Sequence, residues 1–224
     1  MKRRIVPSLV VAALLLAGAL VQAAEPQVVA LPKPDVTGKV TLERAIAQRR
    51  SVREYAPGAL TLAEVSQLMW VAQGITSPDG KRATPSARAV YPLQVWLVAN
   101  DVTGLAAGIY RYEPKEHALA LVTPGLQRDS MAAAARGQET IQHAAAVVAV
   151  IGDSALAATK FRGNAERWLG MEAGFVVQDV YLECTALGLG TVMVGGFDET
   201  AVRRALGVPA GWEALGLMPV GRRK

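Results

Sequence analysis

The stretch that decides the fold is Trp168–Leu187, which reads WLGMEAGFVVQDVYLECTAL and is the longest helical candidate in the chain. Apolar side chains lie nearly all round this segment, a pattern that is typical of a buried helix. Gly170, Ala173 and Gly174 keep one side of it thin, and Gly188 follows its last residue. We therefore expect a long helix that runs through the centre of the fold.

Apolar runs on the N-terminal side of this helix indicate buried strands. They are Leu93–Ala99 (LQVWLVA) and Ala144–Ile151 (AAAVVAVI). Between them, residues 108–112 and 117–122 flank the turn 113–116 and predict a β-hairpin. Shorter strands are expected at 191–194 and 215–220.

Capping signals predict the remaining helices. Thr41 precedes a helical pattern over residues 42–50, and Thr61 with Glu64 forms a capping box for a helix that Gly74 ends. Further helices are expected over 126–136 and from Asp198 to 206. Strands and helices alternate without a repeat or a linker. The sequence therefore predicts one α+β domain over residues 41–224.

The first 23 residues have the pattern of a secretory signal peptide. Lys2-Arg3-Arg4 is followed by an apolar run of 17 residues, and small residues precede an expected cleavage site near Ala23. An uncleaved membrane anchor is the alternative, because a run of that length approaches what a bilayer requires. Residues 24–40 then form an extended, proline-rich lead-in. We expect an exported, periplasmic protein with no membrane contact apart from this leader.

The composition excludes several classes of chemistry. The single cysteine, Cys184, permits no intramolecular disulfide, and two isolated histidines, His117 and His143, give no basis for a metal site. Without the three basic residues of the leader, 21 basic residues stand against 19 acidic ones, a balance that does not indicate a nucleic-acid partner. Neither a phosphate loop, a dinucleotide fingerprint nor a nucleophile elbow is complete. A cofactor is therefore the expected source of any chemistry.

Three segments are candidate ligand sites. Arg49-Arg50-Ser51-Val52-Arg53 offers guanidinium groups and a hydroxyl that suit a phosphate, or else it is a solvated helix end. The small residues of 84–92 would let the backbone approach a flat ring, with Ser86 as a polar contact, or else they form an ordinary loop. Gly195-Gly196 opens the backbone before a helix start, where negative charge is favoured, or else it is a tight turn.

Taken in order, these segments resemble the nitroreductase family of FMN-dependent oxidoreductases. The resemblance covers about residues 41–221. The residues that carry it are Arg49-Arg50-Ser51-Val52-Arg53, Pro85-Ser86-Ala87, Tyr91-Pro92, Gln138, Glu172-Ala173-Gly174, Gln178, Leu187-Gly188-Leu189-Gly190, Gly195-Gly196-Phe197-Asp198 and Pro219-Val220-Gly221.

The resemblance implies a fold, a cofactor and a set of binding residues. The fold would be a mostly antiparallel central sheet flanked by helices, with the long central helix buried at a homodimer interface where FMN is held. Arg49, Arg50, Ser51 and Arg53 would contact the FMN phosphate and ribityl chain, with Arg222 as a late basic residue on the phosphate. The residues expected around the isoalloxazine ring are Pro85, Ser86, Ala87, Gln138, Gly195 and Gly196.

Within the family, Pro85-Ser86-Ala87 and Tyr91-Pro92 look most like the branch of azoline dehydrogenases, which oxidise thiazoline and oxazoline rings in modified peptides. That branch carries a Lys-Tyr pair that manages the proton, and the matching residues here are Lys160-Phe161. Because Phe161 has no phenol, a generic reductase is favoured over azoline oxidation. Lys160 stays a candidate catalytic residue, and Arg88 stands where the family commonly has glycine.

The function expected from this reading is ping-pong hydride transfer. A reduced donor such as NAD(P)H would reduce FMN, and a small electron-poor acceptor such as a nitroaromatic or a quinone would reoxidise it. No protein acid or base is obligatory, because the flavin itself carries the hydride. The alternatives are a non-catalytic flavin or phosphate-ligand carrier, and a structural module held at the membrane by an uncleaved leader.

Overall fold

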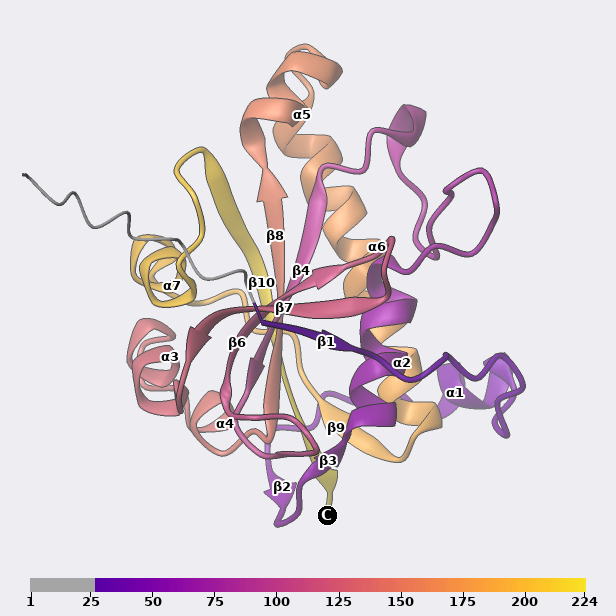
Figure 1. Ribbon diagram of the computed structural model, residues 1–224, viewed down its shortest axis with the longest axis vertical. Helices are drawn as coiled ribbons and strands as arrows, with labels where there is room; N and C mark the ends of the chain where they lie inside the picture. Colours follow the sequence, from indigo (N-terminus) through magenta and orange to yellow (C-terminus); the bar gives the residue numbers. More distant parts are fainter. Residues whose placement is uncertain (1–26) are drawn as a thin grey trace, which may run out of the picture.

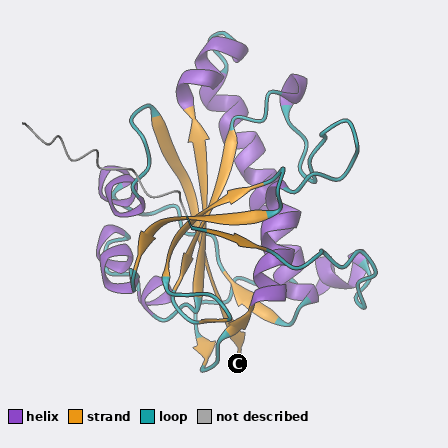
Figure 2. Ribbon diagram, in the orientation of Figure 1, coloured by secondary structure: helices purple, strands orange, loops and turns teal. Residues whose placement is uncertain are grey.

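The computed structural model describes residues 27–224, so the predicted leader lies outside the described residues. In this part of the chain, one antiparallel sheet separates two layers of helices (Figures 1 and 2). The helices are α1 (Leu42–Gln48), α2 (Leu62–Gln73), α3 (Arg128–Ala134), α4 (Glu139–Gln142), α5 (Ser154–Phe161), α6 (Ala165–Ala186) and α7 (Glu199–Leu206). None of the helices among these residues is long and apolar enough to cross a membrane.

The sheet has eight strands within residues 27–224, in the order β1-β7-β6-β4-β8-β10-β2, and β9 pairs with β10. Its pairings are all antiparallel, and a separate parallel pair joins β3 to β5. The strands are β1 (Val28–Ala30), β2 (Tyr55–Ala56), β3 (Leu60–Thr61), β4 (Leu93–Ala99), β5 (Val102–Thr103), β6 (Gly108–Glu113), β7 (Ala118–Pro124), β8 (Ala146–Asp153), β9 (Leu189–Thr191) and β10 (Trp212–Arg223). The predicted α+β fold with a mostly antiparallel sheet is confirmed.

The two central strands, β4 and β8, read as continuous apolar runs because both of their faces are buried. In β4, Leu93, Val95 and Leu97 pack in the cluster formed with α2, α5 and α6. Trp96 and Val98 point the other way, into the cluster formed with α3, α4 and α7. Alternate side chains of a strand lie on opposite faces, so each run supplies both cores.

The capping signals placed the starts of α2 and α7 correctly. The Thr61 side chain accepts a hydrogen bond from the Glu64 N–H, and the Glu64 carboxylate accepts one from the Thr61 N–H, which completes the capping box of α2. Asp198 caps α7 in the same way through the Ala201 N–H. The short helices α4 and α5 were not expected, and β10 is much longer than the 215–220 prediction.

Helix α6 packs against one face of the sheet, and its opposite face is exposed in the single chain. Val176, Val180 and Cys184 are buried on it, whereas Met171 and Phe175 are about two-fifths exposed. In the single chain the predicted central helix is therefore buried on the face toward the sheet only. The other face is the one that the predicted dimer would cover.

Candidate functional site

Tyr181 of α6 joins two of the three predicted ligand segments. Its hydroxyl lies 3.2 Å from the Ser51 Oγ, and it accepts a hydrogen bond from the Met193 N–H at 2.7 Å. The Tyr181 side chain is itself 8% exposed, so the core fixes its position. Ser51 and the segment that leads into Gly195 are therefore held on the same end of α6.

The guanidinium groups of the first segment differ in their contacts. The Arg49 guanidinium lies over the Tyr181 ring, 5.1 Å from its centroid. Arg50 turns back and donates to the Ala47 and Arg49 carbonyls, as a solvated helix end would. The Arg53 side chain is exposed. Among residues 27–224 none of the three forms an ion pair with a carboxylate, so their charge is available to an anion.

A close backbone approach ties the arginine segment to β9. The Val52 N–H donates to the Thr191 carbonyl at 2.8 Å. A Cβ at Gly190 would lie 2.7 Å from Cγ1 of Val52, a distance that real Cβ atoms do not reach. Glycine is therefore required at 190 for this approach. The role of Gly190 in the Gly188-Leu189-Gly190 stretch is thus to admit Val52, in addition to any role in ending α6.

Gln138 fixes the paired glycines from the opposite layer. Its side-chain amide donates to the Gly196 carbonyl at 2.9 Å and to the Ala135 carbonyl at 3.1 Å. Gly195 and Gly196 are exposed, and no acceptor among residues 27–224 takes a hydrogen bond from either N–H. Gln138 thus orients the peptide that follows Gly196, while two backbone donors stay available for a ligand.

Glu172 holds the small-residue segment, residues 84–92. Its carboxylate accepts a hydrogen bond from the Ala87 N–H at 2.8 Å, and the Ser86 hydroxyl in turn accepts one from the Tyr91 N–H. Glu172 is 2% exposed. Burial raises its pKa, and the hydrogen bonds from Ala87 and Ser86 act in the opposite direction. These contacts fix the small-residue stretch 85–87 against the N-terminal half of α6.

One chain does not bring all three segments together. Glu172 and Tyr181 are nine residues apart on α6, which corresponds to about 13 Å along the helix axis. The arginine segment and the paired glycines meet at Tyr181, and residues 85–87 lie near Glu172. Within one chain, these contacts hold the small-residue segment and the other two segments at different ends of α6.

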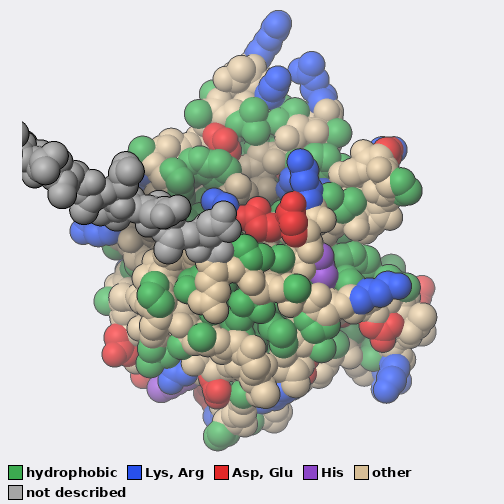
Figure 3. Space-filling view, viewed as in Figure 1, with side chains coloured by type: hydrophobic (Ala, Val, Ile, Leu, Met, Phe, Trp, Pro, Cys, Tyr) green, Lys and Arg blue, Asp and Glu red, His purple; other side chains and the backbone are tan. Residues whose placement is uncertain are grey.

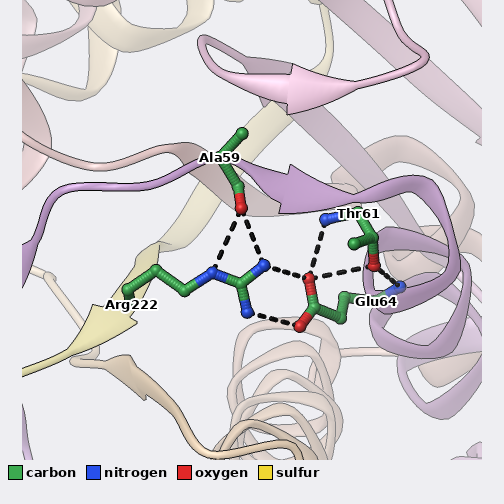
Figure 4. Close-up of polar contacts among 4 residues, drawn as sticks. All are labelled: Ala59, Thr61, Glu64 and Arg222. Carbon is green, nitrogen blue, oxygen red and sulfur yellow. Dashed lines mark hydrogen bonds and ion pairs between the residues drawn. The ribbon is translucent and has the colours of Figure 1, made fainter.

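Arg222 is not available to a phosphate in this structure. Its guanidinium donates to both carboxylate oxygens of Glu64, and its Nε and Nη2 donate to the Ala59 carbonyl at 3.1 and 2.7 Å (Figure 4). Burial acts to raise the pKa of Glu64, but hydrogen bonds from Arg222 and Thr61 outweigh it, and the pKa lies below its ordinary value. Arg222 therefore holds the strand end to the start of α2, and its contact with the FMN phosphate stays a prediction.

Lys160 lies in a cavity next to residues 85–87. This cavity, of about 440 Å³, is lined by Ala87, Arg88, Lys160, Phe161, Arg162 and Trp168. The Lys160 carbonyl accepts a hydrogen bond from Arg88 Nη1 at 3.1 Å, so its backbone is anchored to the small-residue segment. The side chain of Lys160 is exposed at the rim.

Sequence reasoning missed Tyr181 and the anchoring role of Glu172. Both residues stand in the apolar helix, where a polar group needs a partner to be buried without a large free-energy cost. Glu172 was quoted for the resemblance without a role, and nothing in its spacing names the Ala87 N–H as its partner. The only sequence signal for Tyr181 or Glu172 was the presence of a polar group, without an evident partner, in an otherwise apolar helix.

The donor set fits FMN. A phosphate needs several cationic or N–H donors, and Arg49, Ser51 and Arg53 supply them without a competing carboxylate. A flat ring needs an open backbone with N–H groups, and Gly196 has no atom within 4 Å of the place where a Cβ would stand. The residues present therefore suit a phosphorylated, planar cofactor.

The comparisons with known proteins agree with this geometry. The model of the nitroreductase family matches residues 46–222. A candidate nitroreductase of Methanocaldococcus jannaschii is 37% identical over 190 residues, which cover 85% of this chain and 94% of that protein.

Solved structures show the same fold. A candidate nitroreductase from Ralstonia eutropha superposes with a TM-score of 0.78 and 25% identity, over 88% of this chain and 90% of that one. The NADPH:FMN oxidoreductase of Vibrio harveyi, solved with NAD⁺, gives a TM-score of 0.60 at 18% identity, over 82% of this chain and 69% of that one. The chain belongs to the nitroreductase family and is an FMN-dependent oxidoreductase.

Proposed function

We propose that this protein transfers hydride in two half-reactions, from a reduced nicotinamide donor to a small electron-poor acceptor such as a quinone or a nitroaromatic. The observation that carries the proposal is the contact of Tyr181 with both Ser51 and the Met193 N–H. It brings phosphate-binding groups and free backbone donors to one place. The V. harveyi relative named for NADPH and FMN supports the choice of donor and cofactor.

In this proposal the chain binds and orients FMN. Arg49, Ser51 and Arg53 would hold the phosphate, and the N–H groups of Gly195 and Gly196 would be available to the ring. When bound, FMN would supply the two-electron chemistry that links the donor to the acceptor, and with each hydride the acceptor would take one proton from solvent. Positive charge and N–H donors aimed at the ring favour its reduced, negatively charged form.

We further propose a homodimer formed through α6. The exposed strip of this helix contains two glycines, which let a second helix approach closely, and two large apolar side chains. Its members are Gly170, Met171, Gly174, Phe175 and Gln178. A two-fold axis that crosses α6 between residues 176 and 177, toward the C-terminal end of the strip, would place Glu172 of one protomer opposite Tyr181 of the partner, so that residues 85–87 complete the site from the second chain.

Azoline oxidation is the less favoured activity. Phe161 packs beside Trp168, with ring centroids 6.3 Å apart, and it offers no hydroxyl for proton transfer. Lys160 alone remains at the matching position. A carrier without turnover would keep the same FMN contacts, so it differs from a reductase only in activity.

Steady-state kinetics of the FMN-loaded protein test the proposal. NADPH should reduce a quinone such as menadione, and double-reciprocal plots at several quinone concentrations should give parallel lines, as ping-pong transfer requires. A flavin-loaded protein without turnover of either NADPH or NADH would identify a carrier. A requirement for both substrates to bind together would contradict the two half-reactions.

We also propose export to the periplasm, on the basis of the leader pattern in residues 1–23. Sequencing of the mature N-terminus after expression of the full chain tests this proposal directly. A start near Ala24 in the periplasmic fraction is expected. An intact Met1 in the membrane fraction would identify an anchor instead.

A further inference from the structure

The cavity beside Ala87 has a charge pattern that the proposed reaction does not explain. Its rim carries Arg88, Lys160 and Arg162, and its wall carries the rings of Phe161 and Trp168. Among residues 27–224 none of the three cations has a carboxylate partner within ion-pair distance. Figure 3 shows basic side chains gathered around the end of the molecule where α5 lies.

The backbone around this cavity is held in an unusual conformation. Arg88 has φ of 57°, and Arg162 has φ of 42°, so both stand in the left-handed region that favours glycine. Ala89 and Tyr91, close to Arg88, are left-handed as well. Such strain persists where the surrounding structure fixes it, and the Glu172 and Ser86 hydrogen bonds hold the segment around Arg88. Arg162 is the left-handed residue that ends α5, and both arginines line the same cavity.

The walls and the rim together select a class of ligand. A flat aromatic molecule can pack against Phe161 and Trp168, which are tilted by 48° to one another. A carboxylate or sulfonate on that molecule would meet guanidinium and ammonium groups at the rim. A volume of about 440 Å³ suits a molecule of one or two rings.

We propose that this cavity is the acceptor site and that it selects aromatic acceptors that carry a negative charge. This inference rests on the proposed function, because it names the acceptor of the second half-reaction. The contact of Ala87 with the cavity places such an acceptor beside the stretch expected to flank the flavin ring. Arg88, Lys160 and Arg162 are then the residues that determine specificity.

Two acceptors that differ in charge test the proposal on the FMN-loaded enzyme. The pair is 4-nitrobenzoate and 4-nitrobenzamide, and the variant is Arg88→Gln/Arg162→Gln. We expect kcat/KM for the anion to fall about fivefold, as two partly exposed ion pairs allow, and kcat/KM for the amide to stay the same. The control Lys39→Gln/Arg44→Gln removes two charges elsewhere and should change neither value.

The possible outcomes show whether the cations of this cavity bind the acceptor or the donor. A loss shared equally by both acceptors, or no loss with either, would overturn the proposal. A fall in kcat/KM for NADPH without a change for 4-nitrobenzoate would also overturn it, because the cations would then serve the donor phosphate.

A binding measurement keeps this inference apart from the proposed function. Calorimetric titration with 2-naphthoate and 2-naphthamide, neither of which is reduced, should show tighter binding of the carboxylate, and Arg88→Gln/Arg162→Gln should abolish the difference. Charge-selective binding in a protein that does not turn over would refute the reductase and retain the anion site. Turnover without charge-selective binding would refute the anion site alone.

Discussion

The Tyr181 hydroxyl and the Ser51 hydroxyl lie 3.2 Å apart, although 130 residues separate them in the chain. The same Tyr181 oxygen accepts the Met193 N–H at 2.7 Å. One buried side chain therefore sets the spacing between the arginine segment and the paired glycines.

Removal of this hydroxyl should loosen FMN. In Tyr181→Phe two hydrogen bonds are lost, each worth about 1 kcal/mol, so the Kd of FMN should rise by up to about 30-fold. Quenching of FMN fluorescence on binding measures it. Tyr110→Phe loses a hydroxyl that donates to the Ala106 carbonyl, away from the site, and should leave the Kd unchanged. Equal effects of the two variants would contradict the role of Tyr181.

The close approach at Gly190 gives a second prediction. Gly190→Ala places a Cβ 2.7 Å from Val52 Cγ1, so the arginine segment must move and FMN affinity should fall together with stability. Gly163 has open space around its Cβ position but has φ of +72°, so Gly163→Ala should cost stability alone. Titration with FMN and thermal unfolding distinguish the two. Unchanged FMN affinity in Gly190→Ala would contradict the contact.

Arg222 should act on stability rather than on the cofactor. Arg222→Gln breaks the bonds to Glu64 and Ala59 shown in Figure 4, and the free energy of unfolding should fall by about 1 to 2 kcal/mol. FMN affinity of the folded variant should stay within about twofold of the original, whereas Arg53→Gln should weaken it. A large loss of FMN affinity in Arg222→Gln with unchanged stability would instead indicate that Arg222 binds the phosphate.

The ion pair of Glu64 with Arg222 also predicts how the free energy of unfolding depends on pH. Because the folded pKa of Glu64 lies below its ordinary value, its contribution to stability is present above the pKa of the unfolded state, near 4.5. It is lost as the pH falls through the folded pKa. The difference in unfolding free energy between the original protein and Glu64→Gln should therefore shrink below about pH 4.5, measured by urea denaturation. A difference that is constant with pH would contradict it.

Asp179 should behave in the opposite way. Burial raises the pKa of this α6 carboxyl to about 6, and no hydrogen bond to it is formed by residues 27–224. The folded state then holds the proton more tightly, and stability falls as the pH rises from about 4 to 6. Asp179→Asn should remove this fall and gain about 1 kcal/mol at pH 7.5 after screening by solvent. An equal gain at pH 4 would contradict the titration.

The exposed strip of α6 predicts the state of assembly. Phe175 is 40% exposed in one chain, so Phe175→Arg should fold. If the strip is the dimer interface, the variant should be monomeric by sedimentation and should bind FMN poorly, since residues 85–87 of the partner are missing. Ile46→Arg changes an apolar residue on α1 that is 54% exposed and should stay dimeric. A dimeric Phe175→Arg with normal flavin content would contradict this interface.

Local signals predicted much of the fold. The capping box of Thr61 and Glu64 and the apolar runs of β4 and β8 are written in neighbouring residues, and each was read correctly. The exposure of Phe175 in the single chain could not be predicted from the sequence. An apolar helix has the same residue pattern whether the sheet or a second chain covers it.

The candidate site was predictable only in its parts. Arg49, Ser51 and Gly195 were named from their chemistry, but their meeting depends on Tyr181, which lies 130 residues from Ser51. The partners of Arg222 were not predictable either, because sequence spacing does not show that Glu64 and the Ala59 carbonyl accept its hydrogen bonds.

The most direct test of the central claim is the absorption spectrum of the protein purified from cells, read together with its mass in solution. The account predicts a yellow protein with bands at about 370 and 450 nm, one FMN per chain released on denaturation, and the mass of a dimer. A colourless dimer that takes up no added FMN would contradict it.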